Sequence, residues 1–525
     1  MGYYHQVFLS LLGALGFYVF YKLAKIIYHE RTSPLRTLPG PPSSSFIFGN
    51  MKELREVETQ WTEEYGSTIT YKSYFGMSRL YTTDVKAINH ILMNDYVYQK
   101  TEDVRYTLRK ILGDGVLVVE EDKHKQQRRI MIRELTEIFV EKAIELRDIW
   151  RQEVNKSGRI EALSWLSKTT LDVIGLAGFN YNFNALADGK SELNDAFSTL
   201  FQASTSVSIL PVIKALVPAL RFVPGKRDAE AKSSMNTMKR IGYELLHESK
   251  MGLMAEDNNT KVGQNSLKRR DLLSLLLRAN TSNDLPLNQR MSDEDVIAQV
   301  PTFLVAGHET TSTATVWALY ALSLDVRIQS KLRDELLAIG TDNPTMDELN
   351  ALPYLDAVVR ESLRVHSPVR DSSRVAMKDD VIPLAKPIRD IHGNLLDRVR
   401  VCKGETFVIP VAALNLDKSI WGGDAAEFKP ERWEKLPETV GSVPGVWGNM
   451  MTFLGGPRAC IGYRFSLVEM KALLFTLIRA FEFELGVAPE DLIKKSRIVR
   501  RPLLRSDPGA GNQMPLILKP VNLTM

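Results

Sequence analysis

Residues 453–462 read FLGGPRACIG, and this segment contains one of the two cysteines of the chain. The Gly-Gly-Pro run at 455–457 predicts a rigid turn before Cys460, and the residues from Tyr463 onward predict a helix. Cys460 is therefore expected just before a helix N-terminus, where free N–H groups and the helix dipole favour a thiolate over a thiol. A thiolate is the form of cysteine that binds a metal such as iron. The alternative is a small buried cysteine in a tight turn.

The composition is that of an ordinary globular protein, with 525 residues of which 44% are hydrophobic and 25% charged. A chain of this length can bury a large core and enclose a cofactor. The net charge of +4, from 67 basic and 63 acidic residues, argues against nucleic acid as the main partner. Because Cys402 and Cys460 are the only cysteines, disulfides are not the basis of the fold, and a reducing compartment is expected.

The N-terminal segment has the character of a membrane anchor. Residues 7–21 carry no charge, and the apolar character continues to residue 28 with only Lys22 and Lys25 in between. Lysine stems can carry their charge to the interface, so about 22 residues are available for a span that needs ~20. We therefore predict an N-terminal transmembrane helix within an anchor at residues 1–30; a cleaved signal peptide is the less favoured alternative. Basic residues follow the segment, which places the large C-terminal portion in the cytosol.

The remaining sequence predicts a linker and one globular domain that is mainly α with a minor β portion. A proline-rich run at residues 38–42 predicts a stiff, non-helical linker within residues 31–45, before a domain at 46–525. Alternating β-formers predict a hairpin made of residues 69–74 and 80–82. Periodic apolar residues predict helices at 84–93, 122–138, 162–176, 229–251, 292–324, 356–365 and 463–481. A mobile surface loop is expected at 256–266, and irregular structure at 341–352 and 436–448.

Two further motifs contain paired ionisable side chains. Glu361 and Arg364 are spaced i and i+3, and His124 and Arg128 are spaced i and i+4, so each pair lies on one helix face. Taken alone, the spacing of Glu361 and Arg364 is more typical of a solvated surface pair, and His124 could equally be an ordinary surface histidine.

A third motif, AGHETT at residues 306–311, lies inside the long predicted helix. Gly307 destabilises a helix, and we interpret it as a place where a ligand approaches the backbone. Mid-helix threonines such as Thr310 can bond back to helix carbonyls. The alternative is a helix that simply has a polar face.

Together these motifs resemble the cytochrome P450 family over residues 38 to about 520. The segment around Cys460 matches the family signature F-x-x-G-x-R-x-C-x-G at every fixed position. The A-G-x-E-T-T, E-x-x-R and P-E-R-W elements at residues 306–311, 361–364 and 430–433 occur in the order typical of the family. Fungal microsomal members, particularly basidiomycete ones, look most similar.

The resemblance implies a cytochrome P450 fold with haem b (iron protoporphyrin IX), whose iron is held by the Cys460 thiolate. It implies that Thr310 steadies dioxygen and that Glu309 helps to relay protons. It further implies a buried, structural network of Glu361, Arg364 and Arg432. The basic residues implied to contact the haem propionates are His124, Arg128, Arg374 and Arg458. His124 stands where the family often has tryptophan, which leaves its own contact open.

The leading hypothesis is a monooxygenase that uses O₂ to hydroxylate or oxidise a lipophilic small molecule, in fungal, terpenoid-like secondary-metabolite biosynthesis. Electrons are expected from NADPH through a separate NADPH–cytochrome P450 reductase, because no G-x-G-x-x-G site follows a predicted strand. The expected location is the endoplasmic reticulum membrane, as a single-pass protein with its catalytic domain in the cytosol. The alternatives are an isomerase or dehydratase that does not use O₂, and a non-catalytic haem-binding protein. By resemblance, the substrate pocket is lined by residues 101–118, 201–224, 303–311, 368–373 and 512–516.

Overall fold

The computed structural model describes all residues except 1, 52, 54–57, 129–135, 188–195, 197–212, 215–216, 218–219, 221–227, 259–270, 272, 275, 278–289, 497 and 522–525. The chain forms two compact units that interleave along the sequence. Unit 1 comprises Met1–Ile111, Gln202–Lys232 and Asp371–Ala413, and unit 2 comprises Leu112–Phe201, Ser233–Arg370 and Leu414–Met525. Because each unit is assembled from separate stretches, no single linker divides them.

Unit 1 is built around a five-stranded sheet with strand order β1-β2-β8-β5-β3. The strands are β1 (Thr68–Lys72), β2 (Ser78–Thr82), β3 (Tyr98–Gln99), β5 (Ser372–Ala376) and β8 (Thr406–Ile409). β1 and β2 form the predicted antiparallel hairpin, and β2 continues the sheet in parallel with β8. A separate hairpin joins β6 (Asp380–Arg389) and β7 (Leu395–Val401).

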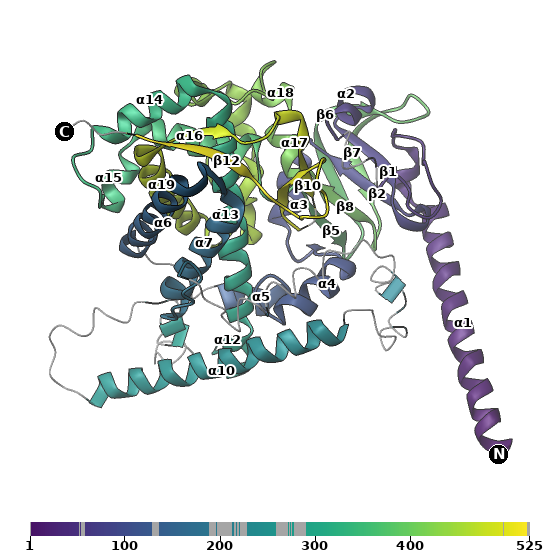
Figure 1. Ribbon diagram of the computed structural model, residues 1–525. Helices are drawn as coiled ribbons and strands as arrows, with labels where there is room; N and C mark the ends of the chain where they lie inside the picture. The colour runs from purple at the N-terminus through teal and green to yellow at the C-terminus, as the bar shows by residue number, and fades with distance from the viewer. Residues whose placement is uncertain are drawn as a thin grey trace. The chain divides into compact units, whose positions relative to one another are not determined.

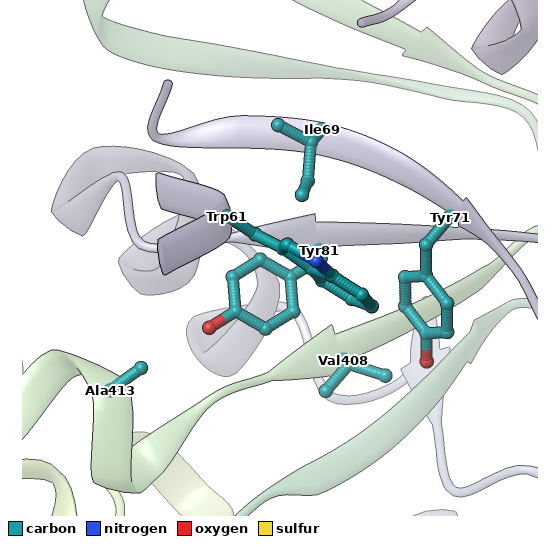
Figure 2. Close-up of a cluster of buried hydrophobic side chains, with 6 residues drawn as sticks. All are labelled: Trp61, Ile69, Tyr71, Tyr81, Val408 and Ala413. Atoms are coloured by element: carbon teal, nitrogen blue, oxygen red, sulfur yellow. The ribbon is translucent and has the colours of Figure 1, made fainter. Parts of the chain in front are cut away.

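Aromatic side chains form a core beside this sheet. Trp61, from α2 (Glu58–Tyr65), lies with its ring centroid 5.8 Å from that of Tyr71 and 6.5 Å from that of Tyr81. Figure 2 shows these three rings gathered with Ile69 and Val408, all of them buried. Because large aromatic side chains remove much apolar area from water, this cluster stabilises the pairing of β1, β2 and β8.

The other helices of unit 1 include α1, which contains the predicted membrane anchor. The helical elements are α1 (Gly2–Thr32), η1 (Pro34–Thr37), η3 (Tyr74–Gly76), α3 (Val85–Met93), α4 (Glu102–Leu112) and α17 (Val411–Asn415), the last two ending at or just past a unit boundary. Near the C-terminal end of α1, Glu30 accepts hydrogen bonds from the Ser78 backbone N–H at 2.7 Å and from Lys72 Nζ at 3.1 Å, which joins the helix to the sheet. Residues 38–42 contain neither helix nor strand, as predicted for the proline-rich run.

The predicted transmembrane span is not found, although its residues do form a helix. Among the described residues, no helix combines the length and the apolar character that crossing a membrane requires. Lys22 and Lys25 interrupt the apolar run of α1 after residue 21, so the longer stretch was predicted only by including them.

Unit 2 is mainly helical and is organised around α13 (Gln299–Leu324), which packs against α7 (Ala162–Phe179), α16 (Pro353–Val365) and α19 (Tyr463–Ala480) (Figure 1). Among the described residues, the other α-helices are α5 (Glu121–Arg128), α6 (Thr136–Ser157), α10 (Asp228–Asn258, whose first residues belong to unit 1), α12 (Asp293–Ile297), α14 (Val326–Leu337), α15 (Met346–Asn350) and α18 (Lys418–Trp421). Single 3-10 turns are η6 (Pro430–Glu434), η7 (Glu438–Ser442), η8 (Met451–Phe453), η9 (Gly456–Arg458) and η10 (Pro489–Asp491).

The strands of unit 2 form two small sheets. One has the strand order β4-β12-β9, and the other is the antiparallel hairpin β10-β11. Their bounds are β4 (Arg159–Glu161), β9 (Phe481–Leu485), β10 (Leu492–Ser496), β11 (Arg500–Leu504) and β12 (Pro515–Pro520). The fold is therefore mainly α with a minor β portion, as predicted.

Several predicted element boundaries need correction. The helix predicted at 292–324 is divided at Ala298 into α12 and α13. The helix predicted at 122–138 corresponds to α5 and the start of α6, and its middle lies outside the described residues. The loop predicted at 256–266 begins inside α10, and its remainder also lies outside them. Residues 341–352 are not wholly irregular, because Thr345 and Glu348 form a capping box that starts α15.

Candidate active site

The cysteine loop folds as the sequence predicts, with Cys460 between the turn η9 and the start of α19. Leu454 and Gly456 adopt positive φ angles of 56° and 67°, which reverse the chain. The Cys460 backbone N–H then donates to the Phe453 carbonyl at 2.8 Å, closing the loop on itself. The loop therefore fixes the direction in which the cysteine side chain leaves the backbone.

The Cys460 side chain is exposed and stands beside open space at Gly462. The side chain is exposed, yet burial raises the pKa of its thiol, outweighing the Gly462 N–H and the Arg128 charge that lower it. A methyl group built on Gly462 would meet no atom within 4 Å, which indicates open space beside the loop. The predicted preference for a thiolate is thus not met by the protein alone; a bound metal ion would deprotonate the thiol.

Two of the predicted basic residues lie beside this cysteine. Arg128 donates from Nη1 to the Ala459 carbonyl at 2.6 Å. Arg458 donates to the Val119 carbonyl at 3.0 Å and forms an ion pair with Glu120, a residue that the sequence did not single out. Guanidinium groups at this position fit the propionate carboxylates of a haem. At Arg458, a propionate would share the guanidinium group with Glu120. The reachable thiol, the space at Gly462 and these arginines together fit that cofactor.

The other two predicted propionate residues are placed differently. His124 is buried on α5, with 5% of its side chain exposed, so it is not an ordinary surface histidine. Arg374 belongs to unit 1, where it is buried on β5 and donates to Ser372 Oγ at 2.7 Å and to the Ser373 carbonyl at 2.9 Å. The structure therefore brings Arg128 and Arg458 to the cysteine and describes Arg374 within the other unit.

The network of Glu361, Arg364 and Arg432 is present, which confirms the prediction. Arg364 donates from Nε and Nη2 to the two carboxylate oxygens of Glu361 at 2.9 and 2.7 Å, with both side chains fully buried. Arg432 adds a contact of 3.3 Å to the same carboxylate, and Trp433 donates to it at 3.1 Å. Arg364 also donates to three backbone carbonyls, of Asn415, Ala425 and Glu427, which tie α16 to the chain that leads to the cysteine loop.

Gly307 on α13 packs against α7. A methyl group added at this position would lie 2.9 Å from Cγ1 of Ile174 on α7. The glycine therefore allows close packing of α13 against α7, and the predicted approach of a ligand to its backbone stays a prediction. Thr310, one turn further along, is half-buried, and its hydroxyl donates back to the Ala306 carbonyl at 2.7 Å.

Glu309 is held between two partners that the sequence did not predict to meet. Its Oε1 lies 3.2 Å from His308 Nε2, and its Oε2 pairs with Arg501 of β11. Burial lowers the pKa of His308 to about 4. His308 Nδ1 lies 2.6 Å from the Leu304 carbonyl and must donate to it, so a neutral ring presents a bare Nε2 to Glu309. A proton shared between Nε2 and Oε1 satisfies both atoms.

The segments expected to line the substrate pocket stay predictions. The segment 201–224 lies almost entirely outside the described residues. Within the predicted stretch 512–516, Met514 and Leu516 are fully buried. The β10-β11 hairpin supplies Arg501 to the active-site helix instead. The sequence signal for this contact of Arg501 was the basic run KKSRIVRR at 494–501, which is unusual before an apolar C-terminal strand.

Comparisons with known proteins agree with this site. A family model described as Cytochrome P450 matches residues 39–506. The chain is 53% identical to two proteins of Postia placenta, "Cytochrome P450 monooxygenase 205" and "Cytochrome P450 monooxygenase 128", over 95% of each chain. It is 34% identical to "Cytochrome P450 monooxygenase claW" of Ampulloclitocybe clavipes, over 98% of this chain and 97% of that protein. The relatives are thus matched over nearly their whole length.

Proposed function

Because the chain belongs to the cytochrome P450 family of monooxygenases, we propose that it inserts one oxygen atom of O₂ into a lipophilic small molecule. The observation that carries the proposal is the cysteine loop, which leaves the Cys460 side chain exposed beside open space at Gly462, in the same unit as Thr310 and Glu309 of α13. Haem bound through a cysteine thiolate supplies the redox chemistry that activates dioxygen.

The residues of this chain supply binding, position and protons. Cys460 provides the sulfur ligand, and the Gly462 N–H, which donates to that sulfur, stabilises its negative charge. Arg128 and Arg458 offer guanidinium groups to two carboxylates. Thr310 holds a hydroxyl proton against the Ala306 carbonyl and can turn it toward the half-buried face of α13. These tasks need no movement of the backbone.

Glu309 and His308 are positioned to hold the proton that this chemistry consumes. His308 Nε2 and Glu309 Oε1 lie 3.2 Å apart, one residue from the Thr310 hydroxyl along α13, so a proton taken up here can be shared between them. Proton transfer by a placed acid contributes typically ~10²–10⁴-fold to a reaction rate. We assign Glu309 the role of relay and Thr310 that of the last donor.

The reaction requires electrons, which we propose come from NADPH through a separate NADPH–cytochrome P450 reductase. The proposed setting is the biosynthesis of terpenoid-like secondary metabolites. Its support is that the matched relatives come from the fungi Postia placenta and Ampulloclitocybe clavipes.

We also propose that α1 attaches the protein to the endoplasmic reticulum membrane, with the catalytic residues on the cytosolic side. The support is the set of large apolar side chains that α1 exposes, among them Phe17 at 73%, Phe20 at 68% and Tyr28 at 70%. Removing residues 1–30 is expected to shift the protein from the membrane to the soluble fraction and leave its haem spectrum intact. Complete retention in the membrane fraction would contradict this attachment.

The oxygenase proposal is tested with Thr310→Ala in membranes that contain the reductase. NADPH consumption is expected to continue, while the ratio of product to NADPH falls and hydrogen peroxide rises, because the arranged hydroxyl proton is lost. Thr315→Ala is the matched control, since Thr315 makes the same back-bond on α13, to the Thr311 carbonyl at 2.9 Å. An unchanged ratio in Thr310→Ala would refute the role of Thr310. Product formation without O₂ would favour an isomerase or dehydratase, and no product under any condition a haem carrier.

A further inference from the structure

A pocket lies where the C-terminal end of α19 meets α6 and the segment that follows α14. It opens to solvent, and its polar lining consists of Arg147, Arg151, Asp342, Thr476 and Arg479, all of them in unit 2. The α19 helix starts at Tyr463, just after Cys460, so Thr476 lies ~20 Å further along the helix axis. The pocket is therefore separate from the candidate active site.

Two of the arginines share one carboxylate. The Asp342 side chain lies 3.2 Å from Arg147 Nη1 through Oδ2 and 3.1 Å from Arg479 Nη1 through Oδ1. The side chains of Arg147 and Arg479 are only 14% and 12% exposed, whereas that of Asp342 is 63% exposed. Two largely buried guanidinium groups thus face a carboxylate that stands at the surface and can turn into solvent.

Other contacts hold the two guanidinium groups in place. Arg479 donates to the Thr341 carbonyl at 2.5 Å and to the Ile339 carbonyl at 3.3 Å. Arg147 donates from Nε to Asp148 at 2.8 Å. An anion that took the place of the shared carboxylate would meet donors whose positions are already set, which lowers the entropic cost of binding.

Two polar atoms of the lining have no hydrogen-bond partner among the described residues. They are the hydroxyl of Thr476, a residue that is 5% exposed, and the buried Nε of Arg479. A buried donor without a partner is unfavourable and calls for an explanation, such as a ligand or a water. Since both residues line the pocket, an acceptor oxygen inside it would offer them a partner.

The charges around the pocket favour a doubly charged anion. Arg151 lies 3.5 Å from Asp148, and both side chains are about half exposed. Once Asp342 turns to solvent, the three arginines face only the Asp148 carboxylate, and two positive charges are left. A phosphate group carries about −1.5 to −2 charges near pH 7 and has three acceptor oxygens, whereas a carboxylate has one charge and two oxygens. Guanidinium groups also match phosphate oxygens in pairs.

We propose that this pocket binds a phosphate group in the place of Asp342. Arg147 and Arg479 hold the group through their guanidinium N–H donors, and the Thr476 hydroxyl donates to it. Because the pocket opens to solvent, the group is either free phosphate or a phosphate monoester. The site goes beyond the proposed oxygenase function, since it joins α6 to the far end of α19 and takes no part in turnover.

The test is calorimetric titration of the full-length, haem-loaded protein with inorganic phosphate and, separately, with glycerol 3-phosphate. The buffer is free of phosphate, chloride keeps the ionic strength constant, and the pH is about 8, where both compounds are largely dianions. The wild type is expected to bind with a Kd on the order of 1 mM. Binding of inorganic phosphate alone supports a site for the free ion, and binding of glycerol 3-phosphate supports a site for monoesters.

Three variants separate this pocket from general surface charge. Arg147→Met is expected to weaken binding about 10-fold, the size of one lost charge-assisted hydrogen bond. Asp342→Asn is expected to tighten binding about 10-fold, because the competing carboxylate loses its charge. Lys156→Met is the matched control: it removes another cation of α6, 69% exposed and paired with Glu153 at 2.7 Å, and is expected to leave binding unchanged.

The proposal is overturned if the wild type binds neither compound, or if Asp342→Asn leaves the affinity unchanged. A loss in Lys156→Met as large as that in Arg147→Met would overturn it as well. Should Arg147→Met fail to fold, judged by circular dichroism, Thr476→Val takes its place, because it keeps the shape of the side chain and removes only the unpaired hydroxyl. It is expected to weaken binding of both compounds, and equal binding by this variant and the wild type would count against the site.

Discussion

Glu361→Gln is expected to lower the free energy of unfolding sharply, because it removes the only charge of Glu361 while keeping its shape. Arg364 and Glu361 are both fully buried, and the two bonds of 2.9 and 2.7 Å between them are charge-assisted. Removing one partner of a buried ion pair costs about 3–5 kcal/mol, because the remaining charge is left uncompensated. Against a total stability of roughly 5–15 kcal/mol, this loss is large.

The assay is urea unfolding of the haem-loaded protein, followed by far-ultraviolet circular dichroism, with the midpoint and the slope compared between variants. The matched control is Glu244→Gln, which breaks the exposed pair with Arg240 at 2.8 Å on α10, where about 0–1 kcal/mol is expected. The double variant Glu361→Leu with Arg364→Leu should recover part of the loss, since no buried charge is stranded. A loss below about 1 kcal/mol in Glu361→Gln would refute the reasoning.

Two further outcomes test the site and its packing. Cys460→Ser should abolish the thiolate-type spectrum of the reduced carbon monoxide complex, whereas Cys402→Ser should leave it unchanged; a normal spectrum from the first variant would exclude Cys460 as the ligand. Gly307→Ala should destabilise the protein by about 1 kcal/mol, because overpacking against Ile174 exceeds the gain in helix propensity. Gly178→Ala on α7, whose added methyl would lie at an ordinary 3.6 Å from its nearest neighbour, should not destabilise it in the same thermal unfolding experiment.

The features predicted correctly are those that short segments specify. The turn before Cys460 follows from the conformations open to glycine and proline, and the helix after it from apolar spacing. The buried network of Glu361, Arg364 and Arg432 was predicted because the motif order resembles a known family, since spacing alone fits a surface pair equally well.

Contacts between distant segments were not predictable in this way. Nothing in the sequence near Glu309 indicates that Arg501 lies against it, because the pair forms only when β11 reaches α13. The packing of Gly307 against Ile174 has the same origin and was not predicted. The short helix α15 was missed for a different reason. Irregular structure was predicted there, although the capping box of Thr345 and Glu348 could be read from the sequence.

The ion pair of Glu309 with Arg501 has to be reconciled with the proposed role of Glu309 as a proton relay. An ion pair with a guanidinium favours the charged carboxylate, which has no proton to give. The two oxygens of Glu309 are, however, engaged separately: Arg501 holds Oε2, while Oε1 faces His308 Nε2 at 3.2 Å. Because the one N–H of the neutral His308 ring is donated to the Leu304 carbonyl, its bare Nε2 can take up a proton and exchange it with the Oε1 side of the carboxylate. Arg501 therefore fixes the position of the carboxylate without occupying the oxygen that exchanges the proton.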